Sequence, residues 1–190
     1  MRVITGSARG RRLRELEGME TRPTTDRVKE GIFSALQFDI EGRRVLDLFA
    51  GTGQLGIEAL SRGAVSAVFV DRRADAVKLI RENLKVTELT DRAQVVAGDS
   101  MEYLSRLREK FDIIFLDPPY EAGLLEPAIA HIARFDILAP HGIMAAEHPA
   151  GKVLPALAPP YRVQRTYRYG KIALTLYRRD ANEMNEETNP

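Results

Sequence analysis

The chain has 190 residues, of which 44% are hydrophobic and 29% charged, and its formal net charge is +1. This size and composition predict one soluble globular domain with a sizeable core. No apolar run approaches the roughly 18 residues that span a bilayer, and the start of the chain lacks the hydrophobic segment of a signal peptide. The absence of cysteine excludes disulfides and thiolate metal sites. We therefore expect a cytoplasmic monomer with no membrane and no metal partner.

Positive charge gathers at the N-terminus. Residues 1–29 carry eight Arg and Lys side chains against four Asp and Glu side chains, a net charge of +4 for this segment. The alternating stretches "RVITG" and "RRLRELEG" are separated by "SARG", where Gly6, Ser7 and Gly10 supply turn residues. We therefore predict a small basic β-hairpin over residues 1–22 as a unit ahead of the main domain.

The main domain is predicted to begin with a helix at about 26–38, because apolar residues recur at helical spacing after "RPTTD". Strand-like and helix-like segments then alternate. The predicted strands are 44–49, 64–71, 92–99, 111–117 and 141–148, and the predicted helices are 54–62, 73–87, 100–109 and 124–138.

This alternation predicts an α/β Rossmann-like fold, a doubly wound and mostly parallel sheet with crossover helices. Two further strand-like runs flank Tyr169-Gly170-Lys171 and predict a C-terminal antiparallel hairpin, which completes a seven-stranded sheet. The main domain should therefore span 23–180. Residues 181–190 are polar and are expected to form a disordered tail.

A glycine loop follows the first parallel strand and enters a helix. Gly51, Gly53 and Gly56 fit the pattern G-x-G-x-x-G, and Asp71 ends the next strand 20 residues after Gly51. Such a loop lets the backbone approach a nucleotide cofactor, while the acid holds ribose hydroxyls. The loop alone leaves a dinucleotide and S-adenosyl-L-methionine as alternatives.

Acidic residues follow four successive predicted strands: Asp47, Asp71, Asp99 and Asp117. The carboxyl ends of strands in an open α/β sheet line one crevice, so these side chains should converge there. A pyrophosphate would favour a bare helix N-terminus, whereas a cationic sulfonium benefits from nearby carboxylates. The four acids therefore favour S-adenosyl-L-methionine over NAD.

The motifs "DLFAGTG", "FVD", "GDS" and "DPPY" resemble, in this order, S-adenosylmethionine-dependent methyltransferases that act on exocyclic amines. With "MRVITGSARGRRL" and "TRPTTDRVKEGIF" ahead of them, residues 1–179 resemble the RsmD family of bacterial 16S ribosomal RNA (guanine-N2) methyltransferases. The resemblance implies S-adenosyl-L-methionine as cofactor and 16S rRNA, or a small-subunit assembly intermediate, as partner. The basic N-terminal arm suits contacts to RNA phosphates, and the candidate RNA-binding residues are Arg9, Arg11, Arg12, Arg14, Arg22 and Arg27.

The resemblance also implies cofactor contacts. Gly51, Thr52 and Gly53 would lie under the methionine portion and Asp71 would bind the ribose, although the longer Glu is common in methyltransferases at that position. Asp99 and Ser100 would meet the adenine. The remaining implied cofactor contacts are Thr24, Thr25, Asp47, Phe49, Arg72 and Asp117.

The segment Asp117-Pro118-Pro119-Tyr120 ends a buried strand with two residues that cannot continue a ladder. The Asp117 carboxylate and the Pro118 carbonyl could accept the two N–H groups of an exocyclic amine and so orient its lone pair. Tyr120 could stack on a base that has left its helix or loop. These four residues are the candidate catalytic residues.

Other functions also fit parts of the sequence. A DNA adenine-N6 methyltransferase shares "DPPY" but usually carries a large recognition insert, and a glutamine-N5 protein methyltransferase favours Asn where this chain has Asp117. An NAD-dependent oxidoreductase would leave "DPPY" without a role, and a non-catalytic RNA-binding module would leave the crevice without one. The three histidines lack metal-ligand spacing, and Glu147-His148 is interpreted only as the end of a strand.

Overall fold

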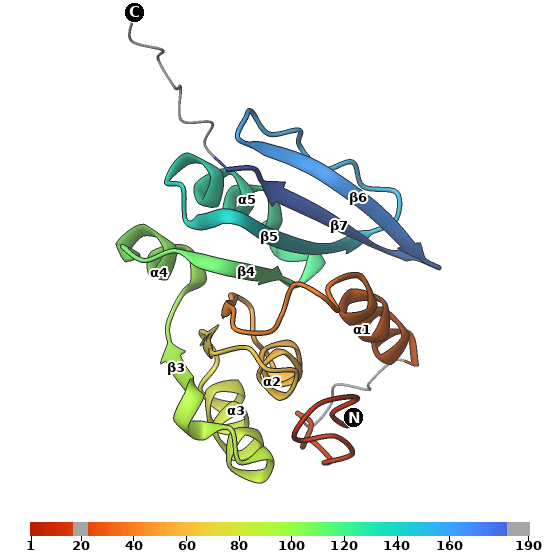
Figure 1. Ribbon diagram of the computed structural model, residues 1–190, viewed down its shortest axis with the longest axis vertical. Helices are drawn as coiled ribbons and strands as arrows, with labels where there is room; N and C mark the ends of the chain where they lie inside the picture. The colour runs from red at the N-terminus through yellow and green to blue at the C-terminus, as the bar shows by residue number, and fades with distance from the viewer. Residues whose placement is uncertain (17–22, 182–190) are drawn as a thin grey trace, which may run out of the picture.

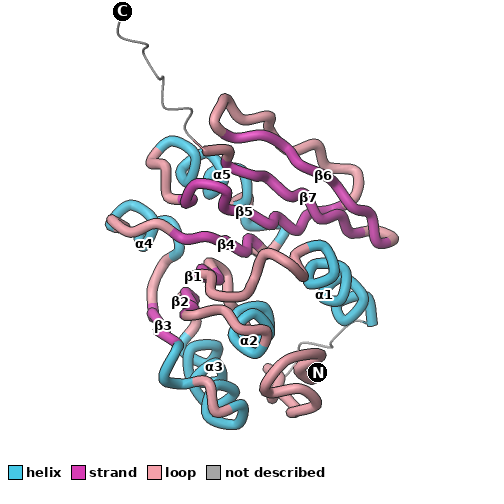
Figure 2. Tube along the Cα trace, in the orientation of Figure 1, coloured by secondary structure: helices cyan, strands magenta, loops and turns pink. Residues whose placement is uncertain are grey.

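The computed structural model describes residues 1–16 and 23–181, without the side chains of 23–26. Its centre is a seven-stranded sheet in the order β3-β2-β1-β4-β5-β7-β6. Figure 1 shows the path of the chain through this sheet, and Figure 2 labels every strand. The strands are β1 Arg44–Asp47, β2 Ser66–Asp71, β3 Ala93–Ala97, β4 Phe111–Leu116, β5 Leu138–Pro149, β6 Tyr161–Tyr169 and β7 Ile172–Arg179. Strands β1 to β5 are parallel, and β7 is antiparallel to both β5 and β6. The predicted Rossmann-like sheet and its C-terminal hairpin are confirmed.

Helices cover both faces of this sheet. They are α1 Pro23–Ala35, α2 Gln54–Ser61, α3 Ala74–Thr87, α4 Ser100–Arg106 and α5 Leu125–Arg134, with 3-10 turns at Thr90–Arg92 and Tyr120–Ala122. Strand β4 shows why the fold has two cores: Ile113 and Phe115 pack with α1, α2 and α3, whereas Ile114 and Leu116 pack with α4 and α5. Successive side chains of a strand point to opposite faces, so a continuous apolar run serves both layers.

Several helix boundaries differ from the prediction: α1 and α4 end at Ala35 and Arg106 rather than at 38 and 109, and two further differences have a clear local cause. The first helix begins at Pro23 rather than 26, because proline is well tolerated in the first turn of a helix. The last ends at Arg134 rather than 138, because Asp136 takes a left-handed φ of 51° and turns the chain toward β5. Ile137 and Leu138 are buried in the same core as α5, which is why they extended the apparent helical pattern.

The N-terminal segment folds back on itself and is fixed to α2. Its predicted antiparallel pairing consists of one isolated bridge between Arg2 and Arg12, rather than two regular strands. The Glu58 carboxylate accepts hydrogen bonds from the Ile4 and Thr5 N–H groups, at 2.7 and 3.0 Å. Gly6 has φ 86°, and a Cβ there would lie 1.8 Å from the Ser61 carbonyl oxygen, so the close approach requires glycine.

Some predictions lie outside the described residues. They are the remainder of the hairpin over 17–22 and the tail over 182–190. Across the described parts of the chain, no helix is long and apolar enough to cross a membrane. Within the same residues, no cluster of three or more His, Cys, Asp or Glu side chains could hold a metal ion.

Candidate active site

The backbone of the glycine loop and of the start of α2 donates hydrogen bonds to two carboxylates. Gly51 and Gly53 have left-handed φ values of 55° and 78°. The Gly51 N–H donates to Asp71 Oδ2 at 2.8 Å, and the Gly56 N–H donates to Asp47 Oδ2 at 3.0 Å. A Cβ added to Gly51 would meet nothing within 4 Å, so the loop backbone is open to a ligand on that side. The loop and the first two strand-end acids therefore form one unit.

Asp47 is a buried carboxyl group at the centre of this unit. Burial raises its pKa from 3.8 to about 7, and the nearby negative charge of Asp71 acts in the same direction. The hydrogen bond from Gly56 opposes the rise but does not overcome it. A cation bound beside Asp47 would favour the ionised carboxylate, so the site is suited to a positively charged ligand.

Asp99 begins α4. Its Oδ1 atom accepts hydrogen bonds from the Met101 and Glu102 N–H groups, at 2.9 and 3.0 Å, as expected of an N-cap. The Ser100 hydroxyl donates to the Leu48 carbonyl at 2.8 Å and therefore ties α4 to the end of β1. An adenine contact for this pair remains a prediction.

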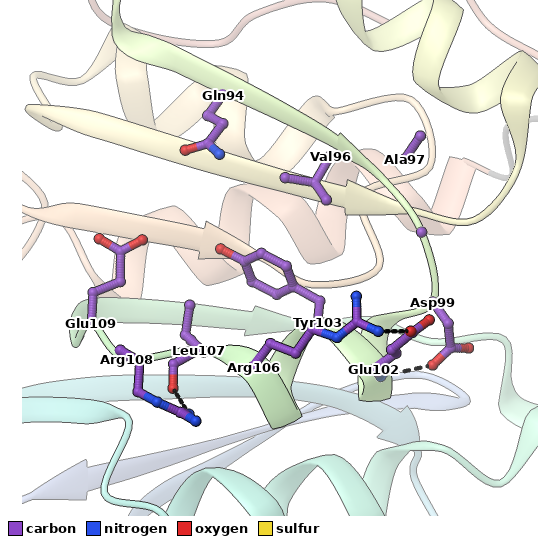
Figure 3. Close-up of a pocket in the computed structure, with 11 residues that line it drawn as sticks. Gln94, Val96, Ala97, Asp99, Glu102, Tyr103, Arg106, Leu107, Arg108 and Glu109 are labelled. Carbon is purple, nitrogen blue, oxygen red and sulfur yellow. Dashed lines mark hydrogen bonds and ion pairs between the residues drawn. The ribbon is translucent and has the colours of Figure 1, made fainter.

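A cavity of about 510 Å³ lies between β3 and α4, with Asp99 at one end and Tyr103 projecting into it (Figure 3). An ion pair between Glu102 and Arg106 forms part of its wall. Asp47, Asp71 and Asp117 do not line this cavity. It adjoins the crevice at Asp99 and is not the place where the other strand-end acids gather.

Asp117 follows β4 directly, next to the end of β5. Leu116 pairs with Ala146, so the residues that follow, Asp117 and Glu147, lie side by side. Their carboxyl groups are hydrogen-bonded to each other. Burial raises the pKa of Asp117 well above its usual value, and the charges of Glu147 and Asp47 raise it further. The pKa of Glu147 is also raised, mainly by burial, so ionisation of both carboxyl groups at once is disfavoured.

Tyr120 completes this cluster. After Pro118, which is buried, and Pro119, which is exposed, the chain enters the 3-10 turn that carries Tyr120. The Tyr120 hydroxyl donates to Glu147 Oε1 at 2.8 Å, while its side chain remains 43% exposed. Glu147 therefore contacts both functional side chains of the "DPPY" segment, although its sequence position suggested only a strand end.

Asn83 of α3 is a second residue that the sequence did not single out. It is fully buried, and its side-chain amide donates to the carbonyl oxygens of Thr52 and Arg14, at 3.0 and 3.1 Å. Its Oδ1 atom accepts from the Arg14 N–H at 2.8 Å. This one side chain therefore connects the glycine loop to the N-terminal segment.

The predicted RNA-binding arginines have different surroundings. Arg11 forms an ion pair with Glu88 and Arg14 forms one with Glu82, at 2.9 and 2.8 Å. The others that the structure describes are exposed: Arg9, Arg12 and Arg27. Arg22 and the side chains of Thr24 and Thr25 lie outside the described parts of the chain. Of the remaining cofactor candidates, Arg72 is exposed and Phe49 is half-buried against the core shared with α4 and α5.

A family model described as "Conserved hypothetical protein 95" matches residues 1–178. "Putative rRNA methyltransferase YlbH" of Bacillus subtilis is 42% identical over 182 residues, which cover 94% of this chain and 99% of the relative. "Ribosomal RNA small subunit methyltransferase D" of Escherichia coli is 37% identical and covers 95% and 91%. The solved structure of "Putative methyltransferase yhhF", also from Escherichia coli, has a TM-score of 0.86 at 32% identity and covers 95% and 98%. The chain therefore belongs to the family described as conserved hypothetical protein 95, the RsmD family that its motifs resemble.

Proposed function

We propose that this protein transfers a methyl group from S-adenosyl-L-methionine to the exocyclic N2 amine of a guanine in 16S ribosomal RNA. The observation that carries the proposal is the cluster of Asp117, Glu147 and Tyr120 beside the buried Asp47. The names of the relatives from Bacillus subtilis and Escherichia coli support rRNA as the substrate class. We place the protein in the cytoplasm, as a monomer acting on 16S rRNA or on a small-subunit assembly intermediate.

The residues present fit S-adenosyl-L-methionine. Asp47 is a buried carboxyl group whose only direct hydrogen-bond donor in the described parts of the chain is the Gly56 N–H, and a nearby cation would stabilise its charge. The open backbone at Gly51 can approach the methionine portion, and Asp71 keeps unused lone pairs for ribose hydroxyls. When bound, S-adenosyl-L-methionine supplies an electrophilic methyl group.

Asp117 and Pro118 would orient the target amine. The guanine N2 lone pair is delocalised into the ring, so the amine is a weak nucleophile until its N–H groups are held in a fixed geometry. The Asp117 carboxyl and the Pro118 carbonyl are the acceptors, and the buried proline ring fixes the position of the second. As the nitrogen gains positive charge, its proton can pass to Asp117 Oδ, and the hydrogen bond to Glu147 keeps that group in place.

Tyr120 would provide the stacking surface for the extruded base. An aromatic face replaces lost base stacking and contributes about 1 to 3 kcal/mol per base. The hydrogen bond from its hydroxyl to Glu147 fixes the position of the ring relative to Asp117. Base stacking and amine orientation are therefore linked through one residue, Glu147.

The other functions lack a comparable supporting observation. A large recognition insert, as in many DNA adenine-N6 methyltransferases, is missing from the described residues, where the connection between β5 and β6 covers only 150–160. The two acids at the glycine loop, Asp47 and Asp71, disfavour the pyrophosphate of NAD, because their negative charge would repel it.

The test is methyl transfer to small ribosomal subunits and to protein-free 16S rRNA, both from cells that lack the gene. Radiolabelled S-adenosyl-L-methionine measures incorporation, and mass spectrometry of digested nucleosides identifies the product. We expect N2-methylguanosine with the wild-type protein and none with Asp117→Ala, which should still bind the cofactor. Label in another nucleoside, in DNA only, or in ribosomal protein would contradict the proposal.

A further inference from the structure

Strand β6 lies at one edge of the sheet, as Figure 1 shows. Its exposed positions include several basic residues. Four residues toward its end and in the following turn form what we call the β6 strip: Arg165, Tyr167, Arg168 and Lys171. The Arg165 guanidinium lies 5.0 Å from the centre of the Tyr167 ring, and the tyrosine is half-buried. The strip thus combines exposed positive charge with an aromatic side chain.

The strip lies at the same edge of the sheet as the candidate active site. Ala173 of β7 pairs with His148 of β5 on one side and with Arg168 of β6 on the other. Arg168 is therefore two strand spacings, about 10 Å, from the residue next to Glu147. The Ala150 N–H donates to the Lys171 carbonyl at 3.0 Å, which fixes the turn to the chain that leaves β5.

The strand beneath the strip is firmly supported. A chain of hydrogen bonds joins Thr166, Thr175 and His148 across β6, β7 and β5, each 2.9 Å long. On the other face of β6 from Thr166, the face that also carries Arg165 and Tyr167, Tyr169 packs against α1, so closely that a Cβ at Gly31 would lie 2.2 Å from the tyrosine hydroxyl. The strip is therefore held in a fixed position relative to Asp117 and Glu147.

The balance of charge differs between the two ends of β6. At its start, far from the active site, Arg162 forms an ion pair with Asp180 at 3.0 Å. In the described parts of the chain no carboxylate forms an ion pair with Arg165, Arg168 or Lys171. Charged side chains on an edge strand also prevent it from pairing with the sheet of another molecule. That role does not explain why the charge is balanced by an ion pair at the start of β6 and is not balanced at its end.

We propose that the β6 strip is a docking surface for RNA and binds the phosphates of nucleotides that flank the target guanine. The inference rests on the proposed function and adds a contact surface to it, separate from the N-terminal arginines. A distance of about 10 Å corresponds to about three steps of a stacked strand at 3.4 Å each, so a nucleotide near the target can reach the strip. Arg165 and Arg168 lie on opposite faces of this edge strand and bind phosphates of a backbone that follows the edge, while Tyr167, on the face of Arg165, offers a surface to an unpaired base.

The test compares two charge-matched double variants. Arg165→Gln/Arg168→Gln removes the strip arginines, and Arg108→Gln/Arg134→Gln removes two exposed arginines that precede β4 and β5 at the opposite edge. Filter binding of a radiolabelled 16S rRNA transcript is measured between 50 and 300 mM KCl. We expect the strip variant to lose about 1.5 from the slope of log affinity against log salt, because each lost phosphate contact removes about 0.7 to 0.9. The control variant should keep the wild-type slope.

Both variants should keep the wild-type melting temperature and S-adenosyl-L-methionine affinity, since neither changes a buried residue or the glycine loop. A strip variant with the wild-type slope, or a control variant with an equal loss, overturns the docking surface while the methylation assay with wild-type protein still stands. A wild-type protein that neither binds the transcript nor methylates rRNA overturns the proposed function and the docking surface together. The two failures are therefore distinguishable.

Discussion

Asp47→Asn tests whether a buried acid at the cofactor loop lowers the stability of the fold. Asparagine keeps an oxygen that can accept the Gly56 N–H but removes the charge that burial disfavours. The pKa of Asp47 is about 7 in the folded protein, against the usual 3.8, so folding favours the protonated form. The contribution of Asp47 to the free energy of unfolding therefore falls as pH rises from 3.8 to about 7 and is flat above that.

The pKa difference gives the size of this effect. Between 3.8 and about 7 it corresponds to a destabilisation of about 4 kcal/mol above pH 7 and about 2 kcal/mol at pH 5.5. Urea unfolding at pH 5.5 and pH 8 should therefore show that the wild type loses about 2 kcal/mol relative to Asp47→Asn between the two values. Titrating groups outside this cluster are common to both proteins and cancel in this comparison, whereas Asp117 loses in the variant the Asp47 charge that raises its pKa.

Asp47→Asn should raise the stability of the fold but lower its affinity for the cofactor. The asparagine variant should be more stable than the wild type at pH 8 and yet bind S-adenosyl-L-methionine more weakly, as measured by calorimetry. Asp91→Asn, in the exposed 3-10 turn after α3, is the matched control and should change neither quantity. The reasoning is refuted if wild type and Asp47→Asn have the same dependence of stability on pH.

Three further substitutions test the contacts around the site. Glu147→Gln removes a negative charge that raises the pKa of Asp117, so the acidic limb of the pH–rate profile for methyl transfer should move to lower pH; an unmoved limb would contradict this. Tyr120→Phe keeps the stacking ring and should raise KM for RNA less than Tyr120→Ala does. For Tyr120→Ala we expect kcat/KM to fall by an amount equivalent to about 1 to 3 kcal/mol. Equal effects of the two substitutions would exclude stacking. Asn83→Ala removes the hydrogen bonds from a buried side chain to the Thr52 and Arg14 carbonyls, so we expect a loss of about 1 to 3 kcal/mol in stability by urea unfolding and weaker cofactor binding by calorimetry. Unchanged cofactor binding would show that Asn83 does not position the glycine loop.

The sequence predicted those parts of the site that depend on local patterns. Gly51, Gly53 and Asp71 are separated by fixed distances along one strand–loop–helix–strand unit, and the hydrogen bond from Gly51 to Asp71 closes that unit. Asp117 was found because two prolines after an apolar run cannot continue a strand. In each case a few neighbouring residues contain the whole signal, so no knowledge of long-range contacts was needed.

Glu147 and Asn83 depend on contacts between distant segments, which is why they were missed. Glu147 meets Asp117 only because β4 and β5 are adjacent and in a register that pairs Leu116 with Ala146. A signal existed, since "IIFLD" and "IMAAE" both end an apolar run with an acid, and parallel neighbours would align them. Asn83 offered no such signal, because a polar residue in "RENLKVT" resembles any solvated helix position.

The acids at this edge of the sheet affect one another's ionisation. The charges of Glu147 and Asp47 raise the pKa of Asp117, and the charge of Asp71 raises that of Asp47, so ionisation of all these groups together is disfavoured. Such an arrangement lowers the stability of the fold, and a stability argument alone would select against it. The positively charged methyl donor of the proposed function would reverse the balance, because it would stabilise the ionised carboxylates that the fold disfavours. Its product carries no such charge, so under that proposal the carboxylates would favour the donor over the product.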